Sequence, residues 1–345
     1  MGTKKVRIEE VASQAHVSTA TVSRAIRGLP GVGKSTRAHV LQVAAELGYT
    51  PSHSAASLAS GSMHTVGLVL PDASRWFFAN AIEAAELTLR EHDYDALVYT
   101  LPDYYDVGRK TFDPEVLRSK VDAVVVLSLF FDEHEVELLR SLNVPAAFLS
   151  VDQPGFSCVG IDDELAMTKA CEHLIGLGHK VIGHLSGMTN DKCPNAPTQR
   201  RRDAWRNALR DHGLEYSDSL DSPSDIMTAH NGFAATNVLL NRRPDVTAIV
   251  ASSDEMAMGA IQALRNRRIE PGRQVSVVGI DGNDLAFAFG LTSVEQPVRQ
   301  ESRRVIELLL QAINGDDEVH KEVFDTNLVV RSSSGHVMRR WRHRR

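Results

Sequence analysis

Residues 17–28 of the chain read V-S-T-A-T-V-S-R-A-I-R-G. Val22, Ala25 and Ile26 recur at the spacing of one helical face, so this stretch predicts a short amphipathic helix. Ser18 stands directly before the helix, where its hydroxyl can accept a hydrogen bond from a free backbone N–H. The outward side of the helix carries small or hydroxylated side chains and two cations, namely Thr19, Ala20, Thr21, Ser23, Arg24 and Arg27.

A second short helix is expected just upstream. Val11, Ala12 and Ala15 fall on one face of it, and His16-Val17 provides the turn between the two helices. This arrangement is typical of a helix-turn-helix, whose second helix enters the major groove of DNA. Small side chains let that helix lie close to the base edges, and an arginine can bind guanine O6 and N7 together.

A third helix is predicted over residues 34–47. Its expected apolar face comprises Val40, Leu41, Ala44 and Leu47. Gly48 is expected to end this helix and Pro51 to lead the chain away from it. The sequence therefore predicts a small all-α head at the start of the chain.

Charge is divided unevenly along the 345 residues. Residues 1–62 carry seven basic and three acidic side chains, a net charge of +4, whereas the whole chain is −6 and the remainder is therefore −10. A basic head suits contact with nucleic-acid phosphates, and an acidic body suits solubility. The length leaves room for two or three domains.

The sequence also indicates the cellular compartment of the protein. Three cysteines without paired spacing argue against a disulfide framework and favour a reducing cytoplasm. Residues 1–6 are polar with no apolar run behind them, so no secretory signal is expected. The apolar run at residues 123–129 has the length of a strand and not of a membrane span. We therefore expect a cytoplasmic protein with no membrane partner.

From Thr65 onward, near-continuous apolar strands alternate with helices in two series. The predicted strands cover residues 65–72, 96–99, 121–127 and 146–149 in the first series, and 181–185, 247–251 and 275–280 in the second. The predicted helices lie near residues 77–91, 164–177, 199–211, 231–241, 255–267 and 298–314. This pattern is typical of parallel sheets covered on both faces. Two such series predict an α/β body of two lobes with a cleft between them.

The head and body together resemble the lactose-repressor/galactose-repressor (LacI/GalR) family. The resemblance rests on residues 8–28, on V-L-Q-V-A-A-E-L-G-Y-T-P at 40–51, and on phrases of the body at 171–183, 251–260, 278–281 and 291–297. It implies a helix-turn-helix head at 1–50, a hinge at 51–62, a type I periplasmic-binding-protein-like core at 63–334 and a basic tail at 335–345. It also implies a transcription regulator, most often a repressor, that binds a palindromic double-stranded DNA operator as a homodimer under control of a small sugar-like effector. A tetramer is the alternative to the homodimer.

The hinge allows two interpretations. On composition alone, residues 52–62 could form a flexible linker. The resemblance implies instead a hinge helix that folds on DNA and inserts Leu58 into the minor groove, with Ala55 beside it. The basic tail also allows two interpretations: it could contact DNA non-specifically, or it could be a solvated terminus.

Several predicted strands end in a carboxylate, where ligands of open parallel sheets bind. These residues are Asp72, Asp152, Asp254 and Asp281. Asp254 can alternatively cap the helix that follows it. An aromatic face can cover a sugar ring, and the candidates are Trp76, Phe77, Phe78 and Phe233, although a phenylalanine more often packs in the core.

The resemblance separates these candidates. It implies that the effector contacts Phe78, Arg201, Ser253 and Asp281. Two departures from the family pattern lie next to these positions: Arg75-Trp76 replaces the usual Asn-Pro, and Ala204 replaces a glycine.

Other function classes fit less well. Residues 28–35 match G-x-x-x-x-G-K-[ST], a phosphate-binding loop, but two helices precede the match where that motif needs a strand. No nucleophile elbow or zinc-spaced cluster is present, so we predict no catalytic residue, metal site or cofactor. A solute-binding protein would use only the two-lobed body, and the basic head argues against it.

Overall fold

A computed structural model describes residues 6–26, 28, 30–49, 62–101, 111–187, 196–316 and 318–337. The chain divides into two compact units, with the boundary between Met63 and His64. None of the helices in these ranges combines the length and apolar character needed to cross a membrane. Cys158 and Cys171 are free and buried, and Cys193 lies outside the described residues.

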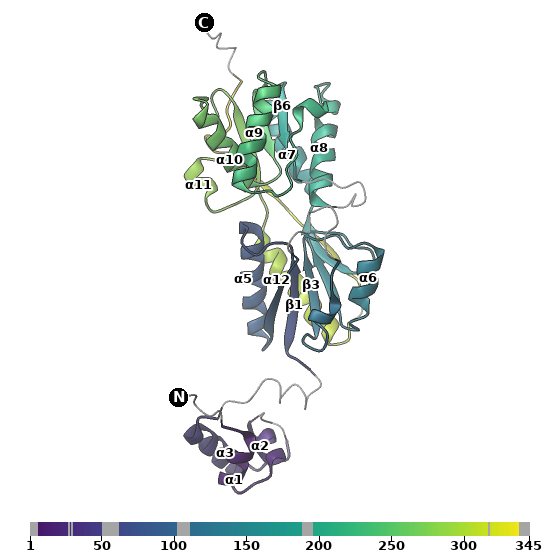
Figure 1. Cartoon of the computed structure of the whole chain (residues 1–345), viewed down its shortest axis with the longest axis vertical. Coiled ribbons are helices and arrows are strands. Elements are labelled where there is room, and N and C mark those ends of the chain that lie inside the picture. The colour runs from purple at the N-terminus through teal and green to yellow at the C-terminus, as the bar shows by residue number, and fades with distance from the viewer. Residues whose placement is uncertain are drawn as a thin grey trace. The chain divides into compact units, whose positions relative to one another are not determined.

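The first unit contains the predicted helices α1 (Ile8–Gln14), α2 (Thr19–Ile26) and α3 (Lys34–Leu47) (Figure 1). His16 takes a left-handed backbone with φ of 54° in the turn between α1 and α2. The Thr21 backbone N–H donates to Ser18 Oγ at 3.1 Å, so Ser18 caps α2 as expected. Gly48, with φ of 66°, ends α3. The helix-turn-helix prediction is confirmed.

One prediction for the head core is wrong. Leu41 is 45% exposed, whereas Val43 is buried with Val40 and Ala44. Positions i, i+3 and i+4 share a helical face, but residue i+1 is turned about 100° away from residue i. Leu41 therefore points out of the cluster that Val11, Val22 and Val40 form.

The first lobe of the body is built on a parallel sheet with strand order β10-β5-β4-β3-β1-β2. Its strands are β1 (Thr65–Leu70), β2 (Asp95–Thr100), β3 (Ala123–Leu127), β4 (Ala146–Leu149), β5 (Ser157–Ile161) and β10 (Lys321–Phe324). Helices α5 (Trp76–Glu91) and α12 (Val298–Ile313) pack side by side on one face, and α6 (Glu133–Arg140) packs on the other. A short 3-10 helix spans Pro114–Val116.

The second lobe has strand order β11-β9-β8-β7-β6. Its strands are β6 (Ile182–Leu185), β7 (Ala248–Ala251), β8 (Ser276–Asp281), β9 (Thr292–Glu295) and β11 (Asn327–Val329). Its helices are α7 (Asp163–Gly176), α8 (Pro197–Asp211), α9 (Ala229–Arg242), α10 (Asp254–Asn266) and α11 (Ala286–Phe289), with a 3-10 turn at Asp218–Leu220. The two-lobed α/β prediction is confirmed, although β5, β9, β10 and β11 were not predicted and β11 is antiparallel to β9.

In the described part of the chain, the backbone passes between the lobes three times: after β5, after β9 and after β10. Because of the second crossing, α12 follows the last long strand of the second lobe yet covers the sheet of the first. Gly335 and Val337, which the sequence assigns to the tail, hydrogen-bond to Ser276 and Leu177 of the second lobe.

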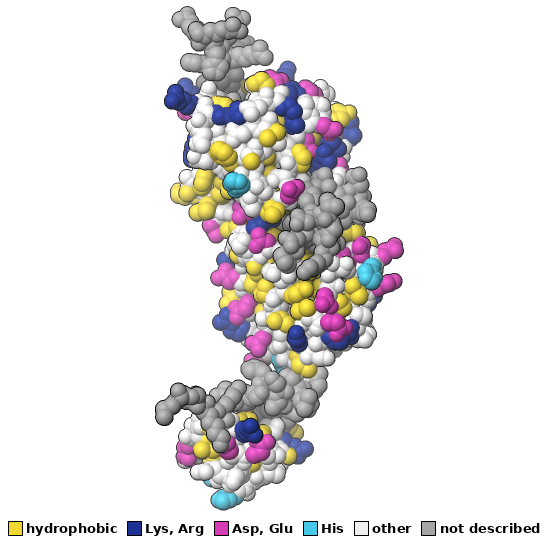
Figure 2. All heavy atoms as spheres, in the orientation of Figure 1, with side chains coloured by type: hydrophobic (Ala, Val, Ile, Leu, Met, Phe, Trp, Pro, Cys, Tyr) yellow, Lys and Arg dark blue, Asp and Glu magenta, His cyan; other side chains and the backbone are white. Residues whose placement is uncertain are grey.

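Apolar side chains gather over α11 on the surface of the second lobe (Figure 2). Phe287 is 83% exposed, and Leu285 beside it is exposed as well. On the first lobe, Leu87 of α5 and Val98 of the edge strand β2 are exposed too. Contiguous exposed apolar patches are typical of interaction surfaces.

Helices α9 and α10 approach so closely that alanine does not fit at their contact. A Cβ on Gly259 would lie 2.0 Å from the Ala229 carbonyl oxygen. We expect Gly259→Ala to lower the free energy of unfolding by about 3 kcal/mol, measured by urea denaturation. Gly176→Ala is the matched control, because a Cβ at Gly176 meets nothing within 4 Å. Equal stability of the two variants would contradict the prediction.

Candidate functional site

The predicted DNA-contact residues of the head lie on the outer side of α2. Ser18, Thr19, Ala20 and Arg24 are exposed, and Thr21 and Ser23 are half-buried. The Ser18 and Thr21 hydroxyls are 2.9 Å apart and hydrogen-bonded. Arg24 forms no ion pair with another described residue, and its side chain is exposed. Arg27, Ala55 and Leu58 lie outside the described residues, and their roles stay predictions.

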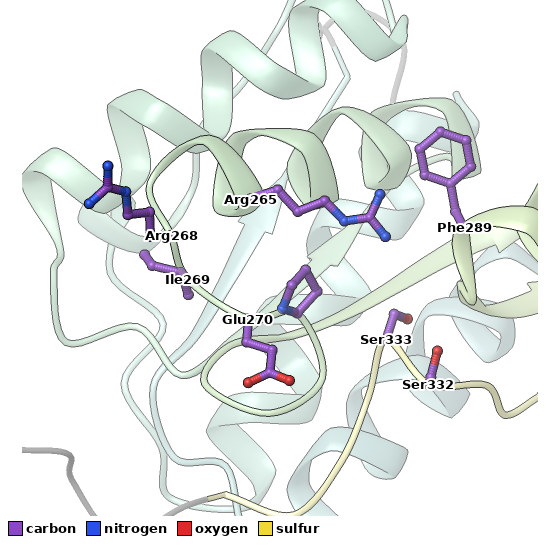
Figure 3. Close-up of a pocket in the computed structure, with 8 residues that line it drawn as sticks. Arg265, Arg268, Ile269, Glu270, Phe289, Ser332 and Ser333 are labelled. Carbon is purple, nitrogen blue, oxygen red and sulfur yellow. The ribbon is translucent and has the colours of Figure 1, made fainter.

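One hollow in the body lies on the outside of the second lobe and not between the lobes. It measures about 430 Å³, and its lining includes Arg265, Arg268, Glu270, Phe289 and Ser332 (Figure 3). The Arg265 guanidinium lies 6.0 Å from the centre of the Phe289 ring. The Arg and Glu side chains are exposed, and none of the predicted effector residues lies here.

The predicted effector residues meet instead in a small cavity between the two lobes. Phe78, Arg201, Ser253 and Asp281 all line it, although these residues are far apart in the sequence. Phe233 is not among the lining residues; it belongs to α9, which packs on α10. The side chains of Asp72 and Asp152 do not line this cavity and make other contacts. Asp72 accepts hydrogen bonds from Ser74, and Asp152 forms an ion pair with Lys321.

Asp281 lies at the end of β8 with a φ of 147°, a strained backbone for a residue other than glycine. Such strain costs about 1–3 kcal/mol and concentrates at functional sites. The Asp281 carboxylate accepts from Gln296 Nε2 at 2.8 Å and from the Asp254 backbone N–H at 3.2 Å. Burial raises the pKa of Asp281, and the neighbouring guanidinium of Arg201 opposes this rise.

Asp254 does not cap α10, contrary to the alternative considered from the sequence. Ser253 is the cap, because its Oγ accepts from the Met256 backbone N–H at 3.3 Å. The Asp254 carboxylate accepts from the backbone N–H groups of Gly282 and Asn283 and from Ser293 Oγ. Burial and the nearby Asp281 raise its pKa. Asp254 therefore fixes the loop that presents Asp281.

Arg201 is buried under the cleft and donates to Asp163 Oδ1 at 2.7 Å and to the Ser252 carbonyl at 2.5 Å. Next to this pair is Glu301 of α12, which is fully buried and whose two carboxyl oxygens accept no hydrogen bond from any described residue. Burial and the nearby Asp163 raise the pKa of Glu301 to about 8. Asp163, Gln296 and Glu301 were not predicted as site residues.

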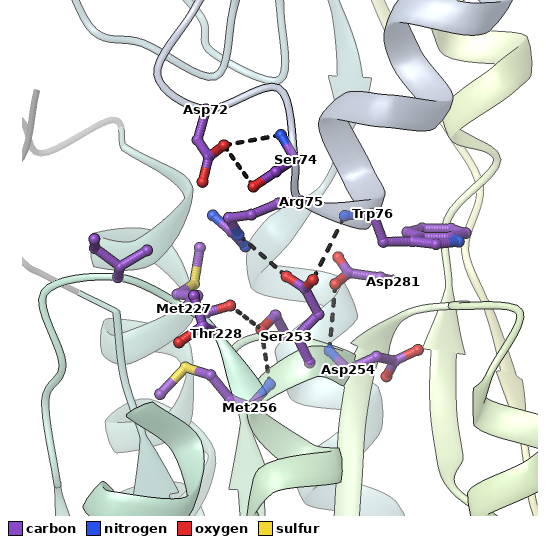
Figure 4. A network of polar contacts seen from close by, with 12 residues as sticks. Asp72, Ser74, Arg75, Trp76, Met227, Thr228, Ser253, Asp254, Met256 and Asp281 are labelled. Carbon is purple, nitrogen blue, oxygen red and sulfur yellow. Dashed lines mark hydrogen bonds and ion pairs between the residues drawn. The ribbon is translucent and has the colours of Figure 1, made fainter. Parts of the chain in front are cut away.

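Arg75 and Trp76 connect the two lobes across the cleft. Arg75 Nε donates to Glu255 Oε2 at 3.1 Å (Figure 4). Trp76 Nε1 donates to Asp284 at 3.1 Å. Glu255 belongs to α10 of the second lobe, whereas Arg75 precedes α5 of the first. The two residues that depart from the family pattern therefore take part in contact between the lobes.

A buried row of Ser252, His184 and Asp221 has the order of a hydrolase triad. Ser252 Oγ lies 3.0 Å from His184 Nε2, and His184 Nδ1 lies 3.2 Å from Asp221 Oδ1. Burial opposes ionisation of Asp221, but the neighbouring side chains of His184, Ser186 and Arg202 lower its pKa to about 2. All three side chains are buried and His184 stacks on Trp205, so the row is part of the packed interior of the second lobe.

Two further motifs lack the context that their chemistry needs. No strand precedes Thr65 among the described residues, so residues 28–35 have no strand to form a phosphate-binding loop. Asp316, Glu318 and His320 bring three possible metal ligands within 4.8 Å of one another, but both carboxylates are exposed.

Comparison with known proteins identifies the family of this chain. Residues 7–52 match the bacterial regulatory proteins of the lacI family, and residues 171–334 match the periplasmic binding protein-like domain. Catabolite control protein A of Priestia megaterium is 32% identical over 94% of this chain and 96% of its own length. The chain belongs to the LacI family. It is therefore a DNA-binding transcriptional regulator with a ligand-binding type of core.

Other members of the LacI family align over the same extent. The transcriptional regulator CelR of Thermobifida fusca is 32% identical over 96% of this chain and 98% of its own length. A solved complex of CelR with cellobiose has a TM-score of 0.69 at 29% identity and covers 95% of this chain and all of that one. The lac repressor dimer bound to operator has a TM-score of 0.82 at 24% identity, covers 96% of this chain and all of that one, and supports the fold.

Proposed function

We propose that this LacI-family regulator is a repressor that binds a palindromic operator as a homodimer and responds to a sugar-like effector in the cleft. The observation that carries the proposal is the pairing of an exposed α2 face in the head with a two-lobed body whose cleft gathers Phe78, Arg201, Ser253 and Asp281. Residues 1–50 would bind DNA, 51–62 form the hinge, 63–334 bind effector and dimerise, and 335–345 form the tail. The site of action would be the cytoplasm.

The effector would act by changing the balance between lobe arrangements. A ligand can shift such an equilibrium only by its difference in affinity for the two arrangements. Fixed carboxylate and amide groups at Asp281 and Gln296 suit the hydroxyls of a sugar, and the Phe78 ring suits its apolar face. Cellobiose bound to CelR supports this ligand class.

The homodimer proposal rests on exposed apolar side chains of both lobes. Phe287 and Leu285 on α11, with Leu87 and Val98 on the first lobe, offer a surface that a second copy can bury. Paired heads would then bind two half-sites about one helical turn apart.

The decisive experiment is selection of bound DNA from random duplexes with full-length protein, repeated with glucose, maltose, cellobiose and sugar phosphates. We expect an enriched palindromic motif whose recovery changes with one of these compounds. Recovery of no enriched motif at low salt by folded protein would overturn the proposal.

Substitutions in the head should separate base readout from phosphate contact. We expect Arg24→Ala to reduce the preference for operator over random DNA by about 5- to 100-fold, because a bidentate guanine contact is lost. Lys34→Ala should weaken binding to both DNAs alike. It should also reduce the slope of log affinity against log salt concentration by about one, because one fewer counterion is released. Fluorescence anisotropy at several salt concentrations measures both effects. Equal losses on operator and random DNA for both variants would contradict this division.

A further inference from the structure

Arg75 occupies the cleft in which an effector is expected. Its side chain is 6% exposed, and its partner Glu255 on the opposite lobe is 23% exposed. The Arg75 guanidinium lies 5.5 Å from the centre of the Phe78 ring, so it covers the aromatic face offered to the cleft. The arginine therefore makes both a charge contact and a ring contact there.

The space left beside Arg75 is too small for a sugar. The cavity measures about 40 Å³. Pockets that bind small molecules usually measure about 300–1,000 Å³, so this cavity is several times too small for a sugar. A sugar-sized molecule fits only after the lobes separate or Arg75 leaves the Phe78 face.

The segment that carries Arg75 is joined to the second lobe at neighbouring points. The Trp76 backbone N–H donates to Glu255 Oε1 at 3.5 Å (Figure 4). The Trp76 indole donates to Asp284. Glu255 therefore accepts from two consecutive residues of the first lobe. Separation of the lobes has to break these contacts together.

We propose that Arg75 and Glu255 form a latch that keeps the empty cleft closed and that an effector must displace. The inference rests on the proposed function in taking this cleft as the effector site. The latch makes Arg75 a specificity-determining residue, because a ligand has to replace its contacts with Phe78 and Glu255. A ligand that leaves Arg75 on Phe78 cannot occupy the site.

Removal of either charge should open the cleft, and the effects of the two substitutions on cleft opening should not be additive. In Glu255→Gln, Arg75 loses its ion pair and keeps only the charge of Asp281, with which it forms no ion pair, and this is costly for a buried cation. In Arg75→Gln, Glu255 is left with its partial exposure and the Trp76 N–H. We therefore expect Glu255→Gln to open the cleft more than Arg75→Gln does, and the double variant to open it no more than Glu255→Gln alone.

Hydrogen–deuterium exchange of the full chain, without DNA or ligand, tests the latch. Peptides covering 75–82 and 253–260 report the two sides of the cleft. We expect Arg75→Gln to speed exchange in both peptides by about 10-fold, Glu255→Gln to speed it more, and Arg75→Lys to retain most of the protection. Arg118→Gln is the matched control, because it removes an ion pair with Glu115 inside one lobe.

Two results would overturn the latch: unchanged exchange on the 253–260 side in both single variants, or a double variant whose rate increase is the product of the single increases. Faster exchange confined to 75–82 would count against it too, since that is loss of a local contact. None of these outcomes bears on operator selection, so failure of the latch and failure of the proposed function are distinguishable.

Discussion

Glu301→Gln is expected to stabilise the protein at pH 8 and to leave its stability nearly unchanged at pH 4.5. Burial raises the pKa of Glu301 to about 8, against an ordinary value of 4.5. The folded state therefore holds this proton more tightly than the unfolded state does. The stabilisation that the neutral Glu301 carboxyl contributes is fully present below about pH 4.5. It is lost as the pH rises toward 8, because the unfolded chain ionises first.

Glutamine stays neutral over this whole range, so the variant avoids that loss. The upper limit of the gain is about 5 kcal/mol at pH 8, from 1.36 kcal/mol per pKa unit. Urea denaturation at several pH values measures it. Glu137→Gln on the exposed face of α6 is the control and should change little. A variant less stable than the parent at pH 8, or a difference independent of pH, would show that the buried carboxyl is stabilised by its surroundings.

Phe287→Asp is expected to convert a dimer into monomers and to weaken operator binding by at least about 100-fold. The ring is 83% exposed in one copy, so aspartate costs the isolated fold little. In a dimer the same ring would be buried, and a central aromatic side chain commonly contributes 2 kcal/mol or more to an interface. Two heads held together also bind DNA far more tightly than one.

Sedimentation equilibrium at micromolar concentration and operator titration measure these two effects. Val238→Asp is the matched control, because Val238 is 54% exposed on α9, away from α11. We expect this control to stay dimeric. A Phe287→Asp variant that remains dimeric with unchanged operator affinity would place the subunit contact elsewhere.

The head could be predicted from the sequence because its signals are local. Ser18 caps α2 and Gly48 ends α3 through contacts within a few residues, and spacing alone reveals such contacts. Leu41 was misplaced because a helix of this length allows two overlapping apolar faces, and only the neighbouring helices α1 and α2 decide between them.

The cleft was partly predictable. Asp281 and Arg201 follow from family phrases, and the structure brings both to one cavity. The charges around them could not be inferred from spacing, because Asp163 and Glu301 come from separate crossings between the lobes. Asp163 follows β5, a strand too short and mixed to be recognised. The partner of Arg75 is 180 residues away, and only the folded body reveals it.

The route of the chain also fixes the order in which the lobes can be completed during synthesis. The ribosome makes β1 to β5, then the second lobe as far as β9, and only afterwards the helix α12 that covers Leu68, Val125 and Leu149. Until residues 298–313 emerge, an apolar face of the nascent first sheet lacks its cover. A nascent chain stalled before Val298 would therefore expose a surface that chaperones bind, even with its second lobe almost finished.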